Sequence, residues 1–384
     1  MLATSRVKTL KFPPGKFWVE NSPMSTDYSL NIHSKFLNYT VKFQDALNLS
    51  AVDLCIVDAN VMKLHEIPND IPLVSLAISE ENKDLGGIAE IIKIFQDQGV
   101  KRSSKVVFIG GGVMQDLGTL AASIYMRGIS WTFCPTTLQA MIDSCIGGKS
   151  SINFNATKNV LGNYYPPSDI QICTNFLSTL STDQIVSGLI EGVKIAIAGD
   201  CLESFVEVLK RYQISGFKSE SEVTKLIMLS LQSKSLIVQE DEFDLGARKL
   251  LNYGHTFGHG IESISNFKID HGAAVGLGVI AANYLSRELG LVNKVRNLSE
   301  TTIIDLLALL GGDLRFKLDS LDLTGIHHFL RGDKKSTDHG YTFVLPSNFG
   351  LVLHNLPFSQ SSDDLILTAL KSAIWEVRKD EVLR

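Results

Sequence analysis

Three separated segments of the chain carry side chains that could hold a divalent metal ion. They are Glu191, the segment His255-Thr-Phe-Gly-His259, and His271. One carboxylate and up to three imidazoles match the ligands of a catalytic zinc, which commonly takes three nitrogen or oxygen ligands and leaves a fourth position to water or substrate. A single histidine is more often an ordinary core or surface residue, and Glu191 with Lys194 could be a plain i,i+3 pair. The sequence therefore offers a candidate zinc site and leaves open which histidines would bind the metal.

Two glycine-rich segments could surround a phosphate group. Gly110-Gly111-Gly112 follows an apolar stretch, but Gln115 stands where the dinucleotide motif G-x-G-x-x-G needs its third glycine. Gly147-Gly148-Lys149-Ser150 resembles the end of a P-loop, yet Asp143 occupies the place of that motif's first glycine. Glycines at a helix start still allow backbone N–H groups to approach a phosphate. The two segments favour a phosphate or pyrophosphate site of a non-standard kind, with tight packing turns as the alternative.

Charged side chains gather around these glycines. Asp143, Lys149, Lys158 and Asn159 lie close together in the sequence, although the chain as a whole has 36 basic and 41 acidic residues. Lone lysines are usually solvated, but this clustering with glycine favours an anion site. Lys234 and Arg248 add further cations shortly before the histidine segment.

The elements that must position these residues change character along the chain. The first half alternates strand-like and helix-like stretches, which is typical of an α/β domain with ligands at the carboxyl ends of its strands. The strand-like stretches are 53–57, 105–109 and 129–134, and a helical stretch covers 116–126. In the second half, apolar residues recur every four positions, as in 185–197, and 223–238 is a second such segment. We expect an α/β domain over residues 1–175, whose first ~25 residues form an irregular extension, and a mostly α-helical domain over 176–384.

Composition narrows the class of protein further. At 384 residues, with 45% hydrophobic and 20% charged residues, the chain is long enough for two domains with ample cores. A formal charge of −5 argues against nucleic acid as a partner. The five cysteines show no CxxC spacing, and the N-terminus lacks the order of a signal peptide, so we expect a cytoplasmic protein. The longest apolar run, 273–285, is too short to span a bilayer.

Taken together, these segments resemble the sugar phosphate cyclase superfamily, and most closely the 3-dehydroquinate synthase family. The matching blocks run from about residue 55 to 336 in the family's order. They are Asp58-Ala-Asn60, Glu80 with Lys83, GGGVMQDLGTLAASIYMRG, PTTLQAMIDSCIGGKSSIN, KNVLGNYYPP, IEGVK, DEFDLGARKLLNYGHTFGH, HGAAV and GDKK. The resemblance implies an NAD-binding α/β domain followed by a helical metal-binding domain, which agrees with the boundary drawn above.

The resemblance also implies roles for individual residues. It makes Glu191, His255 and His271 the ligands of a zinc ion, for which Co2+ could substitute, and it turns His259 into a contact of the substrate phosphate. NAD would be held by Asp58, Asn60, Glu80, Lys83, Gly111, Gly112, Val113, Asp116, Thr136, Thr137, Lys158 and Thr179. The other phosphate contacts would be Lys149, Asn159, Asn252, one of Lys334 and Lys335, and Arg127 reaching in from a second subunit of a homodimer. Lys234 and Arg248 would bind the substrate carboxylate, and Asp143 and Lys194 would contact its hydroxyls.

The implied reaction is the cyclisation of 3-deoxy-arabino-heptulosonate 7-phosphate to 3-dehydroquinate with loss of phosphate. Hydride passes to NAD, phosphate leaves by β-elimination, hydride returns, and an aldol addition closes the ring. Because NAD is regenerated, the enzyme would be a lyase of the shikimate pathway, which leads to the aromatic amino acids. Metal and cations would act by lowering the pKa of a substrate hydroxyl and by orienting the substrate.

Three departures from the family's usual pattern, and two alternatives, accompany this hypothesis. Ala273 and Asp244 stand where the family has glutamate, and Gln115 replaces a glycine; such changes alter the surroundings of metal and NAD rather than a predicted ligand. A paralogue acting on sedoheptulose 7-phosphate or another sugar phosphate is one alternative, although retention of Lys234 and Arg248 favours the keto acid. The other is an NAD- and metal-dependent polyol dehydrogenase related to glycerol dehydrogenase. A non-catalytic binding protein is disfavoured, because it would have no use for a complete ligand set.

Overall fold

The computed structural model of the chain describes residues 28–35, 38–68, 70–155, 157–292, 297–332 and 339–380. Two compact units divide these residues. One, here called the sheet unit, contains the described residues of Phe17–Leu180 together with Leu209–Phe243. The other, the helical unit, contains Ser181–Val208 and the described residues of Asp244–Arg384.

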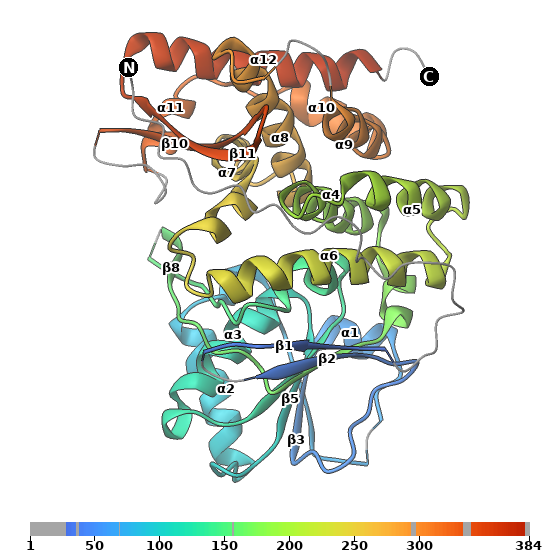
Figure 1. Cartoon of the computed structure of the whole chain (residues 1–384). Coiled ribbons are helices and arrows are strands. Elements are labelled where there is room, and N and C mark those ends of the chain that lie inside the picture. Colours follow the sequence, from blue (N-terminus) through green and yellow to red (C-terminus); the bar gives the residue numbers. More distant parts are fainter. Residues whose placement is uncertain are drawn as a thin grey trace. The chain divides into compact units, whose positions relative to one another are not determined.

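A seven-stranded sheet organises the sheet unit (Figure 1). Its strand order is β1-β2-β9-β6-β5-β3-β4, and only β1 runs antiparallel to its neighbour. The strands are β1 Ser29–Ile32, β2 Tyr39–Phe43, β3 Leu54–Asp58, β4 Leu73–Leu76, β5 Val106–Gly110, β6 Trp131–Pro135 and β9 Asp169–Ile172. The chain goes from β3 to β4 on one side and then returns to β5 on the other side of β3, so the strand order reverses there. In open α/β sheets, ligands bind at such a switch point, outside the carboxyl ends of the strands.

Helices and a hairpin complete the sheet unit. β5 is buried along its whole length, as expected of a parallel strand covered on both faces. The remaining elements are α1 Ala59–Leu64, η1 Glu80–Asn82, α2 Leu85–Asp97, α3 Gly112–Ile124, η2 Tyr125–Arg127, the π-helical turn η3 Ala140–Ser144, the hairpin of β7 Ile152–Phe154 and β8 Thr157–Leu161, η4 Thr174–Thr179 and α6 Glu220–Glu240. α5, Leu202–Ile214, passes from one unit into the other.

The helical unit is built around α8 (Figure 1). This helix carries buried, mostly apolar residues on nearly every side. A helix that is hydrophobic all round must be enclosed, and α8 packs against α4, α7, α9, α12 and β10. The elements are α4 Thr182–Ala198, η5 Ala247–Asn252, α7 His255–Ile264, α8 His271–Glu288, α9 Leu298–Ala308, α10 Gly311–Asp319, α11 Ile326–Gly332, β10 Gly340–Ser347, β11 Gly350–Pro357 and α12 Gln360–Asp380. The β10–β11 hairpin is its only two-stranded element among the described residues.

The predicted fold class, an α/β domain with a parallel sheet plus a mostly helical domain, is confirmed. The single domain boundary predicted near residue 175 stays a prediction. In the division into compact units, residues 209–243 belong to the sheet unit. They include α6, which packs against β1, η3 and η4. The predicted N-terminal extension, about residues 1–25, lies outside the described residues.

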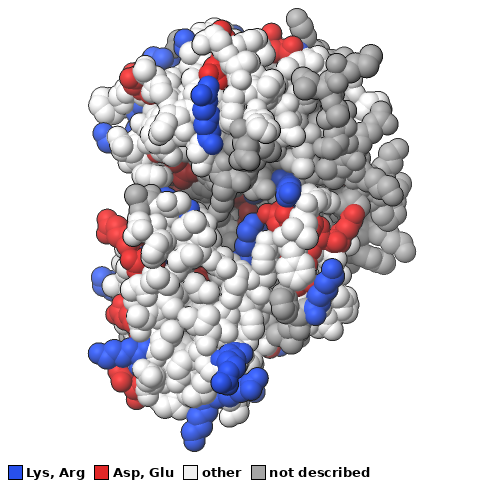
Figure 2. Space-filling view, turned by 90° about the vertical axis from the view of Figure 1, so that its left-hand side faces the viewer, with Lys and Arg blue, Asp and Glu red and all other residues white. Residues whose placement is uncertain are grey.

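Three features expected from the composition can be compared with the structure: the surface charge, the length of the apolar helices and the state of the cysteines. The face shown in Figure 2 carries both basic and acidic side chains. No helix among the described residues is long and apolar enough to cross a bilayer. All five cysteines are buried and unbridged.

Candidate active site

The helical unit brings Glu191, His255 and His271 together, and we call these three the carboxylate–histidine cluster. One potential ligand atom from each lies within 4.8 Å of the others. Glu191 Oε1 is 3.7 Å from His255 Nε2 and 3.3 Å from His271 Nε2. Glu191 lies in the middle of α4, whereas the two histidines are the first residues of α7 and α8. Three helices therefore supply one nitrogen or oxygen atom each to a common point.

Two glycines allow these helices to approach so closely. A Cβ atom on Gly272 would lie 2.3 Å from the Cα of Ser187, one turn before Glu191, so only glycine lets α8 begin against α4. Gly254, directly before His255, has φ +79° and would place a Cβ 2.8 Å from the carbonyl oxygen of Val275 in α8. A side chain at either position would move a histidine away from Glu191.

Burial makes the charge of Glu191 costly unless a cation neutralises it. Its side chain is 1% exposed, and Oε2 forms a close ion pair with Lys194, whose side chain is 3% exposed. Among the described residues, neither oxygen of Glu191 accepts a hydrogen bond of normal geometry. A buried carboxylate requires positive partners, and a divalent cation next to Oε1 would provide one. The donor set of one carboxylate and two imidazoles suits zinc or cobalt, so the residues present fit the implied metal.

The far side of each imidazole is held by another group. His255 Nδ1 is 3.4 Å from the carbonyl oxygen of Tyr253, and His271 Nδ1 is 3.4 Å from Glu262 Oε2. Such contacts fix ring orientation and leave Nε2 for a metal. Burial alone would lower the pKa of His271, but the close contacts and the charges of Glu191 and Glu262 outweigh it and raise the pKa to about 10. Glu262 was not predicted from the sequence; its spacing of seven residues from His255, two turns along one helical face, was the available signal.

Of the remaining predicted residues of the helical unit, His259 lies beside the cluster. The His259 ring lies one turn along α7, with its centroid 5.6 Å from that of His255 and 6.4 Å from that of His271. Arg248, in η5, is only 5% exposed. Asn252 ends η5 and donates a hydrogen bond to the carbonyl of Lys249. Lys334 and Lys335 lie outside the described residues.

In the sheet unit, predicted NAD residues follow the carboxyl ends of three neighbouring strands. Asp58 ends β3 and caps α1, where its carboxylate accepts from the Asn60 N–H at 2.8 Å. Burial raises the pKa of Asp58. The turn from β5 into α3 holds Gly111, Gly112 and Val113, and Thr136 and Thr137 follow β6. Because parallel strands end at one edge of the sheet, these positions surround the switch point between β3 and β5.

A second group of predicted residues forms one polar network. Lys83, 7% exposed, contacts Asp116 Oδ2 at 2.6 Å and donates to Asn159 Oδ1 at 2.8 Å. Burial raises the pKa of Asp116, while Lys83 acts to lower it. Glu80 accepts from Asn153, whose own side-chain oxygen accepts from the Asn159 N–H, and Lys158 lies 3.9 Å from Glu80. The structure thus joins residues predicted for NAD with one predicted for phosphate.

Asp143 and Lys234, 91 positions apart, are brought together in the sheet unit. Their side chains form an ion pair at 2.6 Å, and Lys234 also donates to the Asp143 carbonyl at 2.5 Å. Three other predicted residues belong to the sheet unit: Thr179 bonds to His65, Lys149 is exposed opposite Tyr164, and Arg127 is exposed with a left-handed φ of 64°.

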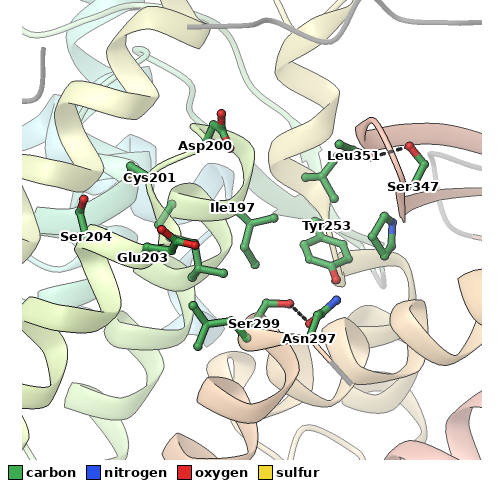
Figure 3. Close-up of a pocket in the computed structure, with 15 residues that line it drawn as sticks. Ile197, Asp200, Cys201, Glu203, Ser204, Tyr253, Asn297, Ser299, Ser347 and Leu351 are labelled. Atoms are coloured by element: carbon green, nitrogen blue, oxygen red, sulfur yellow. Dashed lines mark hydrogen bonds between the residues drawn. The ribbon is translucent and has the colours of Figure 1, made fainter. Parts of the chain in front are cut away.

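A cavity of about 520 Å³ also occurs in the helical unit (Figure 3). Its lining includes Ile197 and Asp200 near the end of α4, Tyr253, and a hydrogen-bonded pair, Asn297 and Ser299. None of its lining residues is a predicted site residue. We therefore locate the chemistry by the side chains of the cluster and not by the size of this cavity.

Comparisons with known proteins agree with this geometry. Residues 73–187 match the family model described as 3-dehydroquinate synthase N-terminal, and residues 188–336 match 3-dehydroquinate synthase C-terminal. A 3-dehydroquinate synthase from Campylobacter jejuni subsp. doylei is 36% identical over 302 residues, which are 78% of this chain and 84% of the relative.

Two solved structures show the same fold. A 2-epi-5-epi-valiolone synthase from Streptomyces hygroscopicus subsp. jinggangensis 5008, solved with NAD+ and Zn2+ bound, has a TM-score of 0.70 and 26% identity, covering 84% of this chain and 91% of that one. A 2-deoxy-scyllo-inosose synthase complexed with carbaglucose-6-phosphate, NAD+ and Co2+ also has a TM-score of 0.70, with 20% identity, covering 90% and 100%.

These matches define the protein class as a phosphate-eliminating cyclase of the sugar phosphate cyclase superfamily, which is a lyase. The chain belongs to the 3-dehydroquinate synthase family. The family implies a sugar phosphate substrate and NAD, and it favours the lyase over the polyol dehydrogenase considered from the sequence.

Proposed function

We propose that the protein converts 3-deoxy-arabino-heptulosonate 7-phosphate into 3-dehydroquinate with elimination of phosphate, in dependence on NAD and zinc. The observation that carries this proposal is the carboxylate–histidine cluster, formed by three helices in a chain of the 3-dehydroquinate synthase family. Two buried cations, Lys234 and Arg248, support the choice of a substrate that carries a carboxylate as well as a phosphate.

Glu191, His255 and His271 would hold the metal, and residues at the carboxyl ends of β3, β5 and β6 would hold NAD. When bound, NAD accepts and returns a hydride, and a divalent metal lowers the pKa of a substrate hydroxyl. The chain's own contribution is to keep both imidazoles oriented, through the Tyr253 carbonyl and Glu262, and to hold Lys194 beside Glu191.

The substrate would be oriented by charge at both of its ends. Lys149, Asn159, Asn252 and His259 would contact the phosphate, as would one of Lys334 and Lys335 and an Arg127 from a second subunit. A phosphate held by cations is a better leaving group, because the charge that develops on departure is stabilised. Lys234 and Arg248 would bind the carboxylate, while Asp143 and Lys194 would hydrogen-bond the hydroxyls and fix the reacting carbons.

We propose further that the protein serves the shikimate pathway, which supplies aromatic amino acids, and that it acts in the cytoplasm as a homodimer. The 36% identity to a 3-dehydroquinate synthase over most of the chain supports that assignment. A second candidate is a paralogous cyclase acting on sedoheptulose 7-phosphate or another sugar phosphate, and the 26% identity to the 2-epi-5-epi-valiolone synthase supports it.

Phosphate release tests the choice between these substrates. The protein is incubated with NAD, Zn2+ and each of a panel of C6 and C7 sugar phosphates. We expect release from the keto acid phosphate and little from sedoheptulose 7-phosphate. Arg248→Met should lower kcat/KM for the keto acid by about one to two decades, the value of a charge-assisted contact, with metal and NAD binding unchanged. Turnover of sedoheptulose 7-phosphate alone would establish the paralogue instead.

A further inference from the structure

Gln115, one of the departures from the family's pattern, makes a two-point contact with the π-helical turn η3. Its side chain is 2% exposed and projects from the first turns of α3. Its Nε2 donates to the carbonyl oxygen of Ser144 at 2.6 Å, and its Oε1 accepts from the Ser144 hydroxyl at 2.6 Å. A glycine at this position could make neither bond.

This contact closes the end of an unusual element. Ser144 is the last residue of η3, and the carbonyls at the end of a helix have no partner within the helix. Gln115 caps the carbonyl of Ser144, and Lys234 caps the carbonyl of Asp143 at 2.5 Å. Two side chains, one from α3 and one from α6, therefore hold the two last carbonyls of η3.

The element held in this way carries a proposed substrate contact. A π-helical turn is less favourable than an α-helical one and is frequently found at functional sites. Asp143 is the residue directly before Ser144, so any rotation of the turn moves its carboxylate. α3, which supplies Gln115, starts at the glycine turn after β5. Gln115 thus ties the turn proposed to bind NAD to the carboxylate of Asp143, which is proposed to contact the substrate hydroxyls.

We propose that Gln115 is a positioning residue that fixes η3 so that Asp143 and its partner Lys234 meet the substrate correctly. The proposal rests on the function proposed above, because it takes Asp143 as the substrate contact. Gln115 touches neither substrate nor cofactor in this role; it acts through Ser144 and the backbone of η3.

The test compares two glutamine-to-methionine variants of the sheet unit. Gln115→Met keeps the volume and removes both bonds. Gln171→Met is the matched control, because Gln171 is also buried, at 8% exposure, but lies in β9 and not at η3. Its side chain makes two hydrogen bonds, of 2.8 and 2.9 Å, to the backbone of Asn48. We expect Gln115→Met to lower kcat/KM about tenfold, the effect of losing a pair of neutral hydrogen bonds, with the Kd for NAD within about twofold of wild type. Gln171→Met should leave kcat/KM within about twofold.

A mutant cycle separates positioning from stability. If Gln115 acts through Asp143, then Gln115→Met should have almost no further effect on kcat/KM in an Asp143→Asn background. If Gln115 only stabilises the fold, Gln115→Met should still lower kcat/KM about tenfold in the Asp143→Asn background, or it should lower only the melting temperature. Either result overturns the proposal. Ser144→Ala removes only one of the two bonds and should cost about threefold. It serves as the test if the methionine variant does not fold.

Hydrogen exchange provides a readout that does not require catalysis. Amide exchange over residues 140–148 should be faster by about tenfold in Gln115→Met than in wild type or Gln171→Met. Unchanged exchange overturns the proposal, as does faster exchange with unchanged kcat/KM. If wild type releases phosphate from no sugar phosphate, the proposed function fails, while the exchange experiment still decides whether Gln115 holds η3.

Discussion

Replacing Glu191 by glutamine tests two roles of its charge, the ion pair with Lys194 and the binding of a metal together with the two histidines. The substitution keeps the shape of the side chain but removes the charge that pairs with Lys194 and that faces the two histidines. Glu300→Gln is a matched control in the same unit, because Glu300 is also 1% exposed and pairs with a largely buried cation, Arg287, at 2.7 Å. Both variants break a buried ion pair, but only Glu191→Gln alters the cluster.

The loss of stability without metal should be similar in the two variants. Removing one partner of a buried ion pair costs about 3–5 kcal/mol, because the other charge remains buried. The amide oxygen can still accept one hydrogen bond from the cation, so we expect the lower end, about 3 kcal/mol, in each case.

The response to metal should differ. Changes in residues behind a metal ligand already cost about 10–100-fold in affinity, so the loss of a ligand should cost about 100-fold or more. At a metal concentration of about 1,000 times the wild-type Kd, binding stabilises wild type by about 4.1 kcal/mol. The same concentration would be only about 10 times the Kd of Glu191→Gln, which gives about 1.4 kcal/mol. Glu300→Gln should keep the full response.

Chelator-treated proteins are unfolded in denaturant with and without Zn2+, and bound metal is measured after gel filtration. We expect stoichiometric metal in wild type and Glu300→Gln and little in Glu191→Gln. If Glu191→Gln retains one tightly bound zinc and the full stabilisation by metal, Glu191 is not a ligand and the assignment of the cluster is wrong.

Three further predictions concern His271, Lys83 and Arg127. Because the pKa of His271 is raised to about 10, the metal-free protein at pH 8 holds a proton there that a metal must displace. Metal binding should therefore release a proton, and metal affinity should fall as the pH falls; calorimetry in buffers of different ionisation enthalpy counts the proton, and a count of zero contradicts this role of His271. Lys83→Met breaks the 2.6 Å pair with the buried Asp116 and should weaken NAD binding at least about tenfold in a titration, whereas unchanged affinity would place NAD elsewhere. Arg127→Ala should be inactive yet dimeric, and mixing it with an inactive His271→Ala protein should restore some activity through one hybrid site; demonstrably mixed dimers without activity would rule out a shared site.

Much of the fold could be predicted because the signals were local. β5 is a continuous apolar run that ends at glycine, and the strand lies at Val106–Gly110 where the pattern indicated 105–109. The four-residue recurrence of Ile185, Leu189 and Val193 indicated the helix that became α4. Strand and helix periodicities depend on neighbours a few positions apart, so a single sequence contains them. The β10–β11 hairpin was not predicted, and its turn at Asn348-Phe349 carries no glycine pair of the usual kind.

The candidate site was predicted less completely, because its geometry depends on contacts between segments far apart in the sequence. Residue types and spacing determined that the chain has one carboxylate and three histidines suited to a metal, and that a glycine turn follows a buried strand. They could not determine that α8 begins against α4 at Gly272, which brings His271 and not another imidazole to within 3.3 Å of Glu191. The pairing of Asp143 with Lys234, and the cap that Gln115 places on Ser144, likewise join segments far apart in the sequence. Such contacts depend on how closely whole elements pack, and that closeness is decided only when the tertiary structure forms.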